Sequence, residues 1–192
     1  MRVSTVTRNT KETQITVDIQ LDGGAFCIDI PSGFLSHMLD ALSKHSGIGI
    51  RVEAKGDVHV DLHHTVEDIG IVLGQSIREA LGDKKGINRY GLAKVPMDES
   101  MVEVCLDISG RPFFQIHGQD VFHGMVGDLD LELIPEFLRS LAFNAGITMH
   151  VTVCACGNSH HLAEACFKAL ARSLKEAIAV TGADIPSTKA CL

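Results

Sequence analysis

The chain has 192 residues, enough to bury a full core as one domain or as two small joined halves. Its formal charge of −7, without any run of lysine and arginine, argues against a nucleic-acid partner, because neutralising phosphates needs clustered cations. No segment approaches the roughly 18 apolar residues of a membrane span, and strand-like sequence follows Met1 without a signal peptide, so we predict a cytoplasmic protein with no membrane contact.

The first half of the chain alternates between strand-like and helical patterns. Asp22-Gly23-Gly24 is typical of a hairpin turn between two strands. Helical spacing of apolar residues follows, and Ser46-Gly47 is expected to end that helix. The elements predicted in order are strands at 13–21 and 25–30, a helix at 34–45, a strand at 48–54 and a helix from the first histidine motif to about residue 81.

The second half repeats this order and carries the same motif. His63-His64-Thr65-Val66-Glu67 opens the last helix of the first half, and His160-His161-Leu162-Ala163-Glu164 opens a second helix 97 residues later. We interpret the repetition as a gene duplication. The elements predicted before the second motif are strands at 102–108 and 113–117, a helix at 133–144 and a strand at 147–154.

The repeated motif predicts metal binding. On a helix, positions i and i+4, or i and i+3, share a face, so each motif can present an imidazole and a carboxylate together. Adjacent histidines point about 100° apart, so each motif is expected to serve two different ions. The alternative for a single copy is a hydrogen-bonded helix start without metal, and the second copy favours metal.

Alignment of the upstream helices, with a loop two residues shorter in the second half, adds one more candidate ligand per half, because His37 falls opposite Glu136. Eight candidates divided between two ions give four ligands each, which suits octahedral centres with positions left for water or substrate. Imidazole and carboxylate together fit Mn²⁺, Fe²⁺ or Zn²⁺, and octahedral preference favours Mn²⁺. The candidate metal ligands are His37, His63, His64, Glu67, Glu136, His160, His161 and Glu164.

The six cysteines are scattered. Cys154-Ala155-Cys156 lies in an apolar strand-like run, and the spacing of Cys27, Cys105, Cys166 and Cys191 fits neither a disulfide framework nor a zinc site. We predict reduced, mostly packed thiols that do not bind metal.

With these motifs in place, the sequence closely resembles the imidazoleglycerol-phosphate dehydratase family. The resemblance covers nearly the whole chain rather than one patch, and its motifs stand in the family's order. They are Arg8-Asn9-Thr10-Lys11-Glu12-Thr13, Phe34-Leu35-Ser36-His37-Met38-Leu39-Asp40, Gly56-Asp57 before the first histidine motif, the two histidine motifs, Gly86-Ile87-Asn88-Arg89-Tyr90-Gly91, Pro96-Met97-Asp98-Glu99, Ser109-Gly110-Arg111-Pro112 and Ile185-Pro186-Ser187-Thr188-Lys189.

The resemblance implies an α+β fold made by tandem duplication, in which each half is a four-stranded sheet with two helices packed on one face. We expect the halves at residues 1–93 and 94–192. It also implies a manganese-dependent hydro-lyase of histidine biosynthesis, with two Mn²⁺ ions per active site, that removes water from imidazole glycerol phosphate to give imidazole acetol phosphate. Members assemble into a homo-oligomer of 24 subunits with active sites between chains.

The resemblance also implies roles for individual residues. The catalytic set is Glu12, His63, Glu67, His160 and Glu164, in which Glu12 is the proton-transfer group provided that it reaches the substrate. The substrate-binding set is Glu12, His45, Arg89, Arg111, Lys168, Ser187 and Lys189, whose cations and donors suit a phosphate.

Several of these positions have a second interpretation from the sequence alone. Lys168 stands four residues after Glu164, so an ordinary helical ion pair is an alternative. His45 either contacts substrate or caps the end of its helix as a cation. Ser187 and Lys189 lie in a C-terminal segment that would normally be a tail, and the resemblance favours a segment that folds over the site.

The chain also departs from the family pattern. Leu62 and Ser36 stand where an aspartate usually precedes the histidine, which removes a partner that could orient the imidazole. Glu136 replaces a common histidine and stays a competent Mn²⁺ ligand. Two rival functions are a metallohydrolase, which would favour His-Glu-x-x-His, and a structural shell in which metal only joins subunits.

Overall fold

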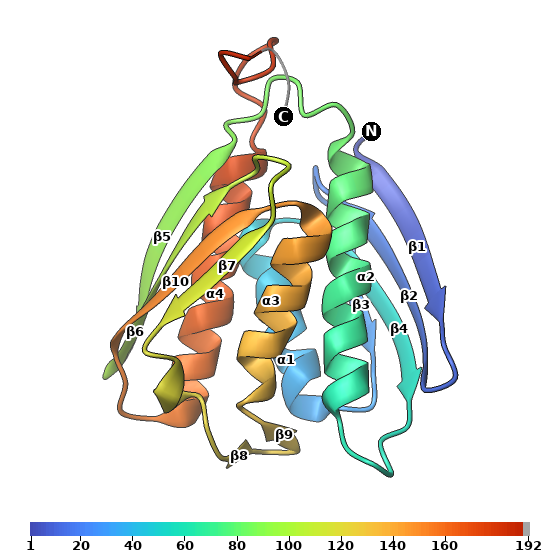
Figure 1. The fold of residues 1–192 in the computed structure, drawn as a ribbon, viewed down its shortest axis with the longest axis vertical. Helices are drawn as coiled ribbons and strands as arrows, with labels where there is room; N and C mark the ends of the chain where they lie inside the picture. Colours follow the sequence, from blue (N-terminus) through green and yellow to red (C-terminus); the bar gives the residue numbers. More distant parts are fainter. Residues whose placement is uncertain (190–192) are drawn as a thin grey trace.

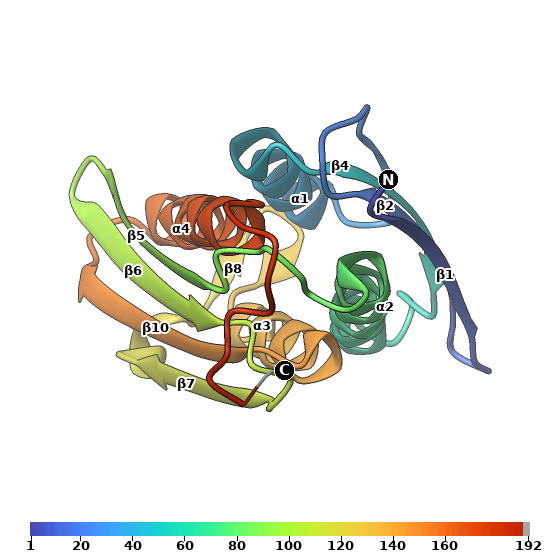
Figure 2. The same ribbon diagram turned by 90° about the horizontal axis from the view of Figure 1, so that it is seen from above.

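The computed structural model describes residues 1–189 of the chain. Two twisted four-stranded sheets form the outer layers, and the helices α1 to α4 lie between them (Figures 1 and 2). Each sheet has four strands and each half contributes two helices that pack on the inner face of its own sheet, as predicted. Among these residues, no helix is long and apolar enough to cross a membrane.

The first half builds a sheet in the order β1-β2-β4-β3. All neighbours in it are antiparallel except β3 and β4, which run parallel. The elements are β1 (Val3–Asn9), β2 (Thr13–Gln20), β3 (Cys27–Asp29), α1 (Gly33–Ser46), β4 (Gly49–Gly56) and α2 (His63–Leu81).

The second half repeats this topology as β5-β6-β10-β7, again with one parallel pair, β7 and β10. It adds a short 3₁₀ turn, Gln119–Val121, and a small hairpin, β8 and β9, before its first helix. The elements are β5 (Tyr90–Met97), β6 (Ser100–Asp107), β7 (Phe113–His117), β8 (Met125–Val126), β9 (Leu129–Asp130), α3 (Leu133–Ala145), β10 (Thr148–Ala155) and α4 (Ser159–Ile178).

The hairpin predicted at Asp22-Gly23-Gly24 is wrong. β2 pairs with β1 on one side and with β4 on the other, so the strand at 27–29 lies beyond β4. The tight turn of this sheet is the one between β1 and β2, where Thr10 accepts hydrogen bonds from the amides of Glu12 and Thr13. The glycine turn after β2 therefore marks the end of that strand, but it does not show which strand pairs with it.

The prediction also missed β5. Its sequence contains Pro96, which argues against a central strand because proline cannot donate to the ladder. β5 is the edge strand of its sheet, where a missing amide is tolerated. The proposed boundary between the halves, after residue 93, falls within this strand.

The helices pair across the two halves rather than within them. α1 packs on α4, and α2 packs on α3 (Figure 2). The second pair is very close, because a Cβ on Gly70 would lie 2.7 Å from the carbonyl oxygen of Phe137, and one on Gly74 would lie 2.6 Å from that of Leu141. Both glycines are therefore required by packing.

The ends of the helices explain where they start and stop. Ser32 caps α1, and Asp128 on the β8–β9 hairpin adds a carboxylate that accepts from the amides of Gly33 and Phe34 and from the Ser32 hydroxyl. α1 and α3 both end at a glycine with positive φ, Gly47 and Gly146, as a left-handed helix cap requires. The hairpin of the second half thus fixes the start of a first-half helix.

The described cysteines are all free, but they are not mostly packed as predicted. Cys166 is buried, and burial raises the pKa of its thiol to about 12. Cys27, Cys105 and Cys154 are exposed, because the outer faces of both sheets are open to solvent in one chain, and Cys156 is exposed in the loop after β10. Cys191 lies outside the described residues.

Candidate metal centre

The α1–α4 pair brings together donors from both halves. Nε2 of His160 lies 3.3 Å from Oε2 of Glu164, and Nε2 of His37 lies 3.5 Å from the same oxygen. Ligand atoms on neighbouring corners of an octahedron are roughly 3 Å apart when the bonds are about 2.1 Å. Because two of the three spacings are near that value and all three donor atoms lie within 4.8 Å of one another, this α1–α4 centre could hold a divalent metal ion.

Glu164 is a nearly buried carboxylate with its two oxygens divided between two tasks. Oε1 accepts from Lys168 at 2.7 Å, whereas Oε2 faces the two histidines. Burial alone would raise the pKa of Glu164, but the Lys168 hydrogen bond and charge and the nearby His37 lower it overall. The carboxylate is thus held ionised with one oxygen still directed at the candidate metal position.

The α2–α3 pair carries the corresponding residues His63, Glu67 and Glu136. Here Arg139 lies against both carboxylates: its guanidinium hydrogen-bonds to both oxygens of Glu136 and lies 3.5 Å from Oε1 of Glu67. The Arg139 hydrogen bond lowers the pKa of Glu136 against the opposing effect of burial, with help from His63. Within residues 1–189, the three donors of this α2–α3 centre do not converge within 4.8 Å as those of the α1–α4 centre do.

The other histidine of each motif faces a different carboxylate. Nδ1 of His64 lies 3.0 Å from Oδ2 of Asp57, which follows β4, and 4.0 Å from Oε2 of Glu12. The Asp57 hydrogen bond raises the pKa of His64, against a smaller effect of desolvation. Sequence reasoning placed Asp57, seven residues before His64, in a family motif but gave it no role.

His161 has the same arrangement in the second half. Its Nδ1 lies 3.0 Å from Oε1 of Glu99 in the turn between β5 and β6, and 3.9 Å from Oδ2 of Asp98. Sequence reasoning placed these two acids in a family motif but gave them no role. Because Nδ1 faces a carboxylate in both motifs, Nε2 of each histidine is the nitrogen left to bind a metal ion.

The two motif helices share one hydrogen bond at their start and differ in a second. At α4, Asn158 caps the helix by accepting from the amides of both histidines, His160 and His161. At α2 the cap position is Leu62, which has no side-chain acceptor, and Asp61 accepts from the amide of His63 at 2.8 Å instead. Asp61 stands 97 residues before Asn158, the same offset as between the motifs, so corresponding residues accept from the first histidine's amide in both helices.

Most of the predicted phosphate ligands gather at the opposite end of the molecule. Arg89 forms a forked ion pair with Asp107 and donates to the carbonyl oxygen of Pro186, which holds the C-terminal segment. Arg111 lies 4.0 Å from the same Asp107 and is 70% exposed. In that segment the amide of Lys189 donates to the Ser187 hydroxyl.

The length of α4 sets the distance between the candidate metal centres and the predicted phosphate ligands. The amide of Arg89 donates to the carbonyl oxygen of Ala177 at the end of α4, whereas His160 stands at its start. Seventeen residues of α-helix span roughly 25 Å. Lys168 and His45 lie between these ends, and desolvation together with the charges of Lys168 and Arg172 lowers the pKa of His45. One chain therefore does not bring all predicted ligands together.

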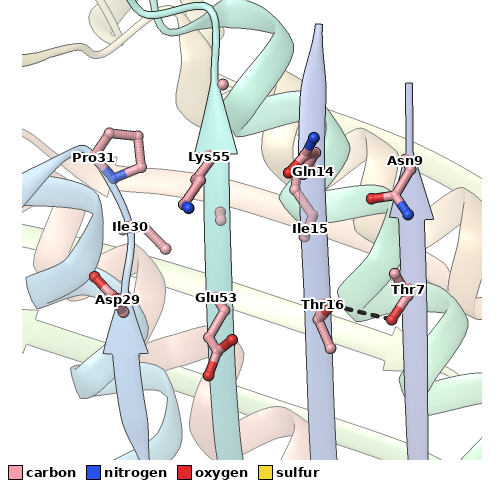
Figure 3. A pocket seen from close by; sticks show the side chains of 12 residues that line it. Thr7, Asn9, Gln14, Ile15, Thr16, Asp29, Ile30, Pro31, Glu53 and Lys55 are labelled. Atoms are coloured by element: carbon pink, nitrogen blue, oxygen red, sulfur yellow. Dashed lines mark hydrogen bonds between the residues drawn. The ribbon is translucent and has the colours of Figure 1, made fainter. Parts of the chain in front are cut away.

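A hollow of about 810 Å³ lies on the outer face of the first sheet, across β1, β2, β4 and β3 (Figure 3). Its walls are uncharged polar side chains such as Asn9 and Gln14, a Thr7–Thr16 hydrogen bond of 3.0 Å, and the charges of Glu53 and Lys55. It contains none of the predicted site residues, and we assign it no chemistry.

Comparison with known proteins decides the family. Residues 31–174 match the model of a family described as imidazoleglycerol-phosphate dehydratase. The chain belongs to the imidazoleglycerol-phosphate dehydratase family. Dehydratases of that name from Azorhizobium caulinodans and Rhodopseudomonas palustris are 50% and 49% identical to it, over 100% and 98% of this chain and 99% and 98% of theirs.

Solved structures of the imidazoleglycerol-phosphate dehydratase family have the same fold. The Staphylococcus aureus structure superposes with a TM-score of 0.84 at 39% identity and covers 93% of this chain and 99% of its own. The Pyrococcus furiosus structure, a complex with (S)-C348, has a TM-score of 0.83 at 34% identity, with 97% and 100% covered. The α+β duplication inferred from sequence is thereby confirmed.

Proposed function

We propose that this chain catalyses the dehydration of imidazole glycerol phosphate to imidazole acetol phosphate in histidine biosynthesis. The observation that carries the proposal is the α1–α4 centre, in which His37, His160 and Glu164 converge in a chain that matches dehydratases along its whole length. A hydro-lyase must hold an imidazole, release a hydroxyl and move one proton, and these donors suit the first two tasks.

Mn²⁺ is the proposed cofactor, with two ions per active site. One ion would be held by the α1–α4 centre, and the other by His63, Glu67 and Glu136. His64 and His161 would add the remaining ligands through Nε2. When bound, such ions would coordinate the imidazole ring and polarise the departing hydroxyl.

Glu12 is the proposed proton-transfer group. It lies in the exposed turn between β1 and β2, and its carboxylate is 4.0 Å from Nδ1 of His64. A carboxylate beside a metal-binding histidine can take a proton from the substrate carbon if the substrate lies within hydrogen-bond reach. Lys168, Arg89, Arg111, Ser187 and Lys189 would bind the phosphate, and His45 would contact the substrate.

These residues make one site only if several chains contribute. In a single chain, roughly 25 Å of α4 separates His160, at the start of this helix, from its other end, where Arg89 lies. His64 and His161 also face carboxylates other than those of the α1–α4 and α2–α3 centres. We therefore propose a cytoplasmic homo-oligomer, of 24 subunits as in the family resemblance, with active sites between chains.

The experiment is dehydration of imidazole glycerol phosphate by the purified, metal-stripped protein, before and after addition of Mn²⁺. We expect turnover that depends on Mn²⁺. Arg111→Ala should assemble normally and lose most of its turnover, because an exposed cation at the phosphate end is removed. Tight Mn²⁺ uptake without any turnover in the unmodified chain would favour a structural shell. Full turnover in Arg111→Ala would show that Arg111 does not bind the phosphate.

A further inference from the structure

The two candidate metal centres differ in the cation that accompanies their carboxylates. At the α1–α4 centre, Lys168 contacts one oxygen of Glu164 and leaves the other to His37 and His160. At the α2–α3 centre, Arg139 contacts both oxygens of Glu136. A guanidinium fork matches a carboxylate in two parallel hydrogen bonds, which a lysine ammonium cannot do.

Arg139 also reaches the second carboxylate of the α2–α3 centre. Its Nη2 lies 3.5 Å from Oε1 of Glu67, so one positive charge lies against the two negative charges that a metal ion would need. The corresponding position in the first half, aligned like Glu136 with His37, is Asp40. Arg139 therefore distinguishes this centre from the α1–α4 centre.

We propose that Arg139 is a built-in competitor for the metal ion at the α2–α3 centre, so that this centre binds metal more weakly than, and after, the α1–α4 centre. The proposal rests on the assignment of Glu67 and Glu136 as metal ligands in the proposed function. While Arg139 holds both oxygens of Glu136, the donors of that centre do not converge, and those of the α1–α4 centre do, among the residues that the structure describes.

The Arg139 side chain can move to a position at the surface when a metal ion displaces it. Its side chain is 46% exposed, and its guanidinium already lies 6.0 Å from the ring of Phe143, one turn further along α3. Phe143 is itself 46% exposed. A cation over an aromatic face keeps part of its favourable electrostatic interaction, so the displaced arginine can stay at the surface beside Phe143 without burying an unpaired charge.

The test is Mn²⁺ titration of the metal-stripped protein, with free Mn²⁺ counted by electron paramagnetic resonance. The unmodified chain should bind in a tight and a weaker phase. In Arg139→Gln the weaker phase should tighten by about tenfold, about 1.4 kcal/mol, and the tight phase should not move. Arg139→Lys keeps the charge but cannot form the two parallel hydrogen bonds, so the affinity of its weaker phase should lie between those of the unmodified chain and Arg139→Gln.

Two further variants make the result specific. Glu136→Gln combined with Arg139→Gln should abolish the gain, because the competed carboxylate is gone. Arg78→Gln, at the exposed far end of α2, is the matched control and should change neither phase. Thermal unfolding should show a larger Mn²⁺-induced rise in Tm for Arg139→Gln than for the unmodified chain.

A weaker phase that is unchanged or loosened in a folded Arg139→Gln protein would overturn the inference. Dehydration at saturating Mn²⁺ distinguishes this from failure of the proposed function. If the unmodified chain turns over substrate and the weaker phase ignores Arg139, only the inference is wrong. If Arg139→Gln tightens the weaker phase but the unmodified chain never turns over substrate, the proposed function is wrong and the competition by Arg139 is still supported.

Discussion

The helix pairs α1–α4 and α2–α3 carry related residues in different surroundings. The first pair has one carboxylate, Glu164, close to two histidines. The second has two carboxylates and a single histidine, and Arg139 contacts both acids. Packing differs as well, because α2 presents Gly70 and Gly74 to α3 where α4 has Phe167 and Ala171. Duplication thus preserved the position of the centres while charge and helix spacing diverged.

The largest expected difference between the centres comes from removing a carboxylate. Glu164→Gln takes away the acid of the α1–α4 centre, so we expect its Mn²⁺ affinity to fall by more than about 100-fold and turnover to be lost with it. Glu67→Gln leaves Glu136 in place and should cost only about tenfold. Isothermal titration with Mn²⁺ measures both, and equal losses would show that the two centres do not differ in this way.

The control for these variants is Glu79→Gln, which changes an exposed acid at the far end of α2. It should bind Mn²⁺ as the unmodified chain does.

A smaller loss of Mn²⁺ affinity is expected when the carboxylates that contact Nδ1 of His64 and His161 are removed. This contact is alike in the two halves. Asp57→Asn and Glu99→Gln should each lower Mn²⁺ affinity by about 10- to 100-fold, because a partner that orients the imidazole is weakened. Folding should be unaffected, which circular dichroism can check. A loss in one half without a loss in the other would mean that the two carboxylates do not have matching roles.

The third comparison concerns how closely α2 packs on α3 and α4 packs on α1. A Cβ at Gly74 would lie 2.6 Å from the carbonyl oxygen of Leu141, so Gly74→Ala should push α3 away and destabilise the protein by about 1–3 kcal/mol in urea unfolding. The corresponding residue of α4, Ala171, already has a methyl group. Ala171→Gly should cost no more than about 1 kcal/mol, as expected of a helix-interior glycine.

The smallest effect concerns Asp128, which ties the β8–β9 hairpin to the start of α1, whereas α3 starts without a side-chain cap. Burial raises the pKa of Asp128, but the amides of Phe34 and Gly33 and the hydroxyl of Ser32 lower it overall. Asp128→Asn should cost about 1 kcal/mol or less at neutral pH, since the side chain is largely exposed and screened.

The pH dependence of this contribution has a definite sign. A carboxyl whose pKa is lowered by folding stabilises the protein above its ordinary pKa of about 4, and the contribution is lost as the pH falls through the folded value. The stability difference between the unmodified chain and Asp128→Asn should therefore shrink below about pH 4. A difference that grows in acid would contradict the assigned hydrogen bonds.

Much of the fold could be predicted because the sequence repeats itself. Apolar spacing and the repeated motif located all four long helices to within a residue or two where their ends were predicted, and the offset between the halves aligned Glu136 with His37. The pairing of strands was less accessible, because a short segment such as β3 carries no signal for the edge that it joins.

The candidate site was harder to predict than the fold. The eight metal ligands remain predictions, but the helices that hold them cross between the halves, which no local pattern indicates. Nothing in the sequence indicates a role for Asp57 or Arg139. Their roles are indicated only by the folded chain, in which Asp57 contacts His64 and Arg139 contacts Glu136 and Glu67. Long-range packing, rather than motif spacing, decides which charges meet.

The crossing of the helix pairs also has a consequence for biosynthesis. A nascent chain leaves the ribosome N-terminus first, and domains fold as their residues become available. α1 and α2 emerge early, but His37 meets His160 and Glu164 only when α4 follows, and His63 and Glu67 meet Glu136 only when α3 follows, among the residues that the structure describes. If the proposed ligands are right, neither centre is complete until the second half is made, so we expect an incomplete chain to hold metal more weakly than the finished one.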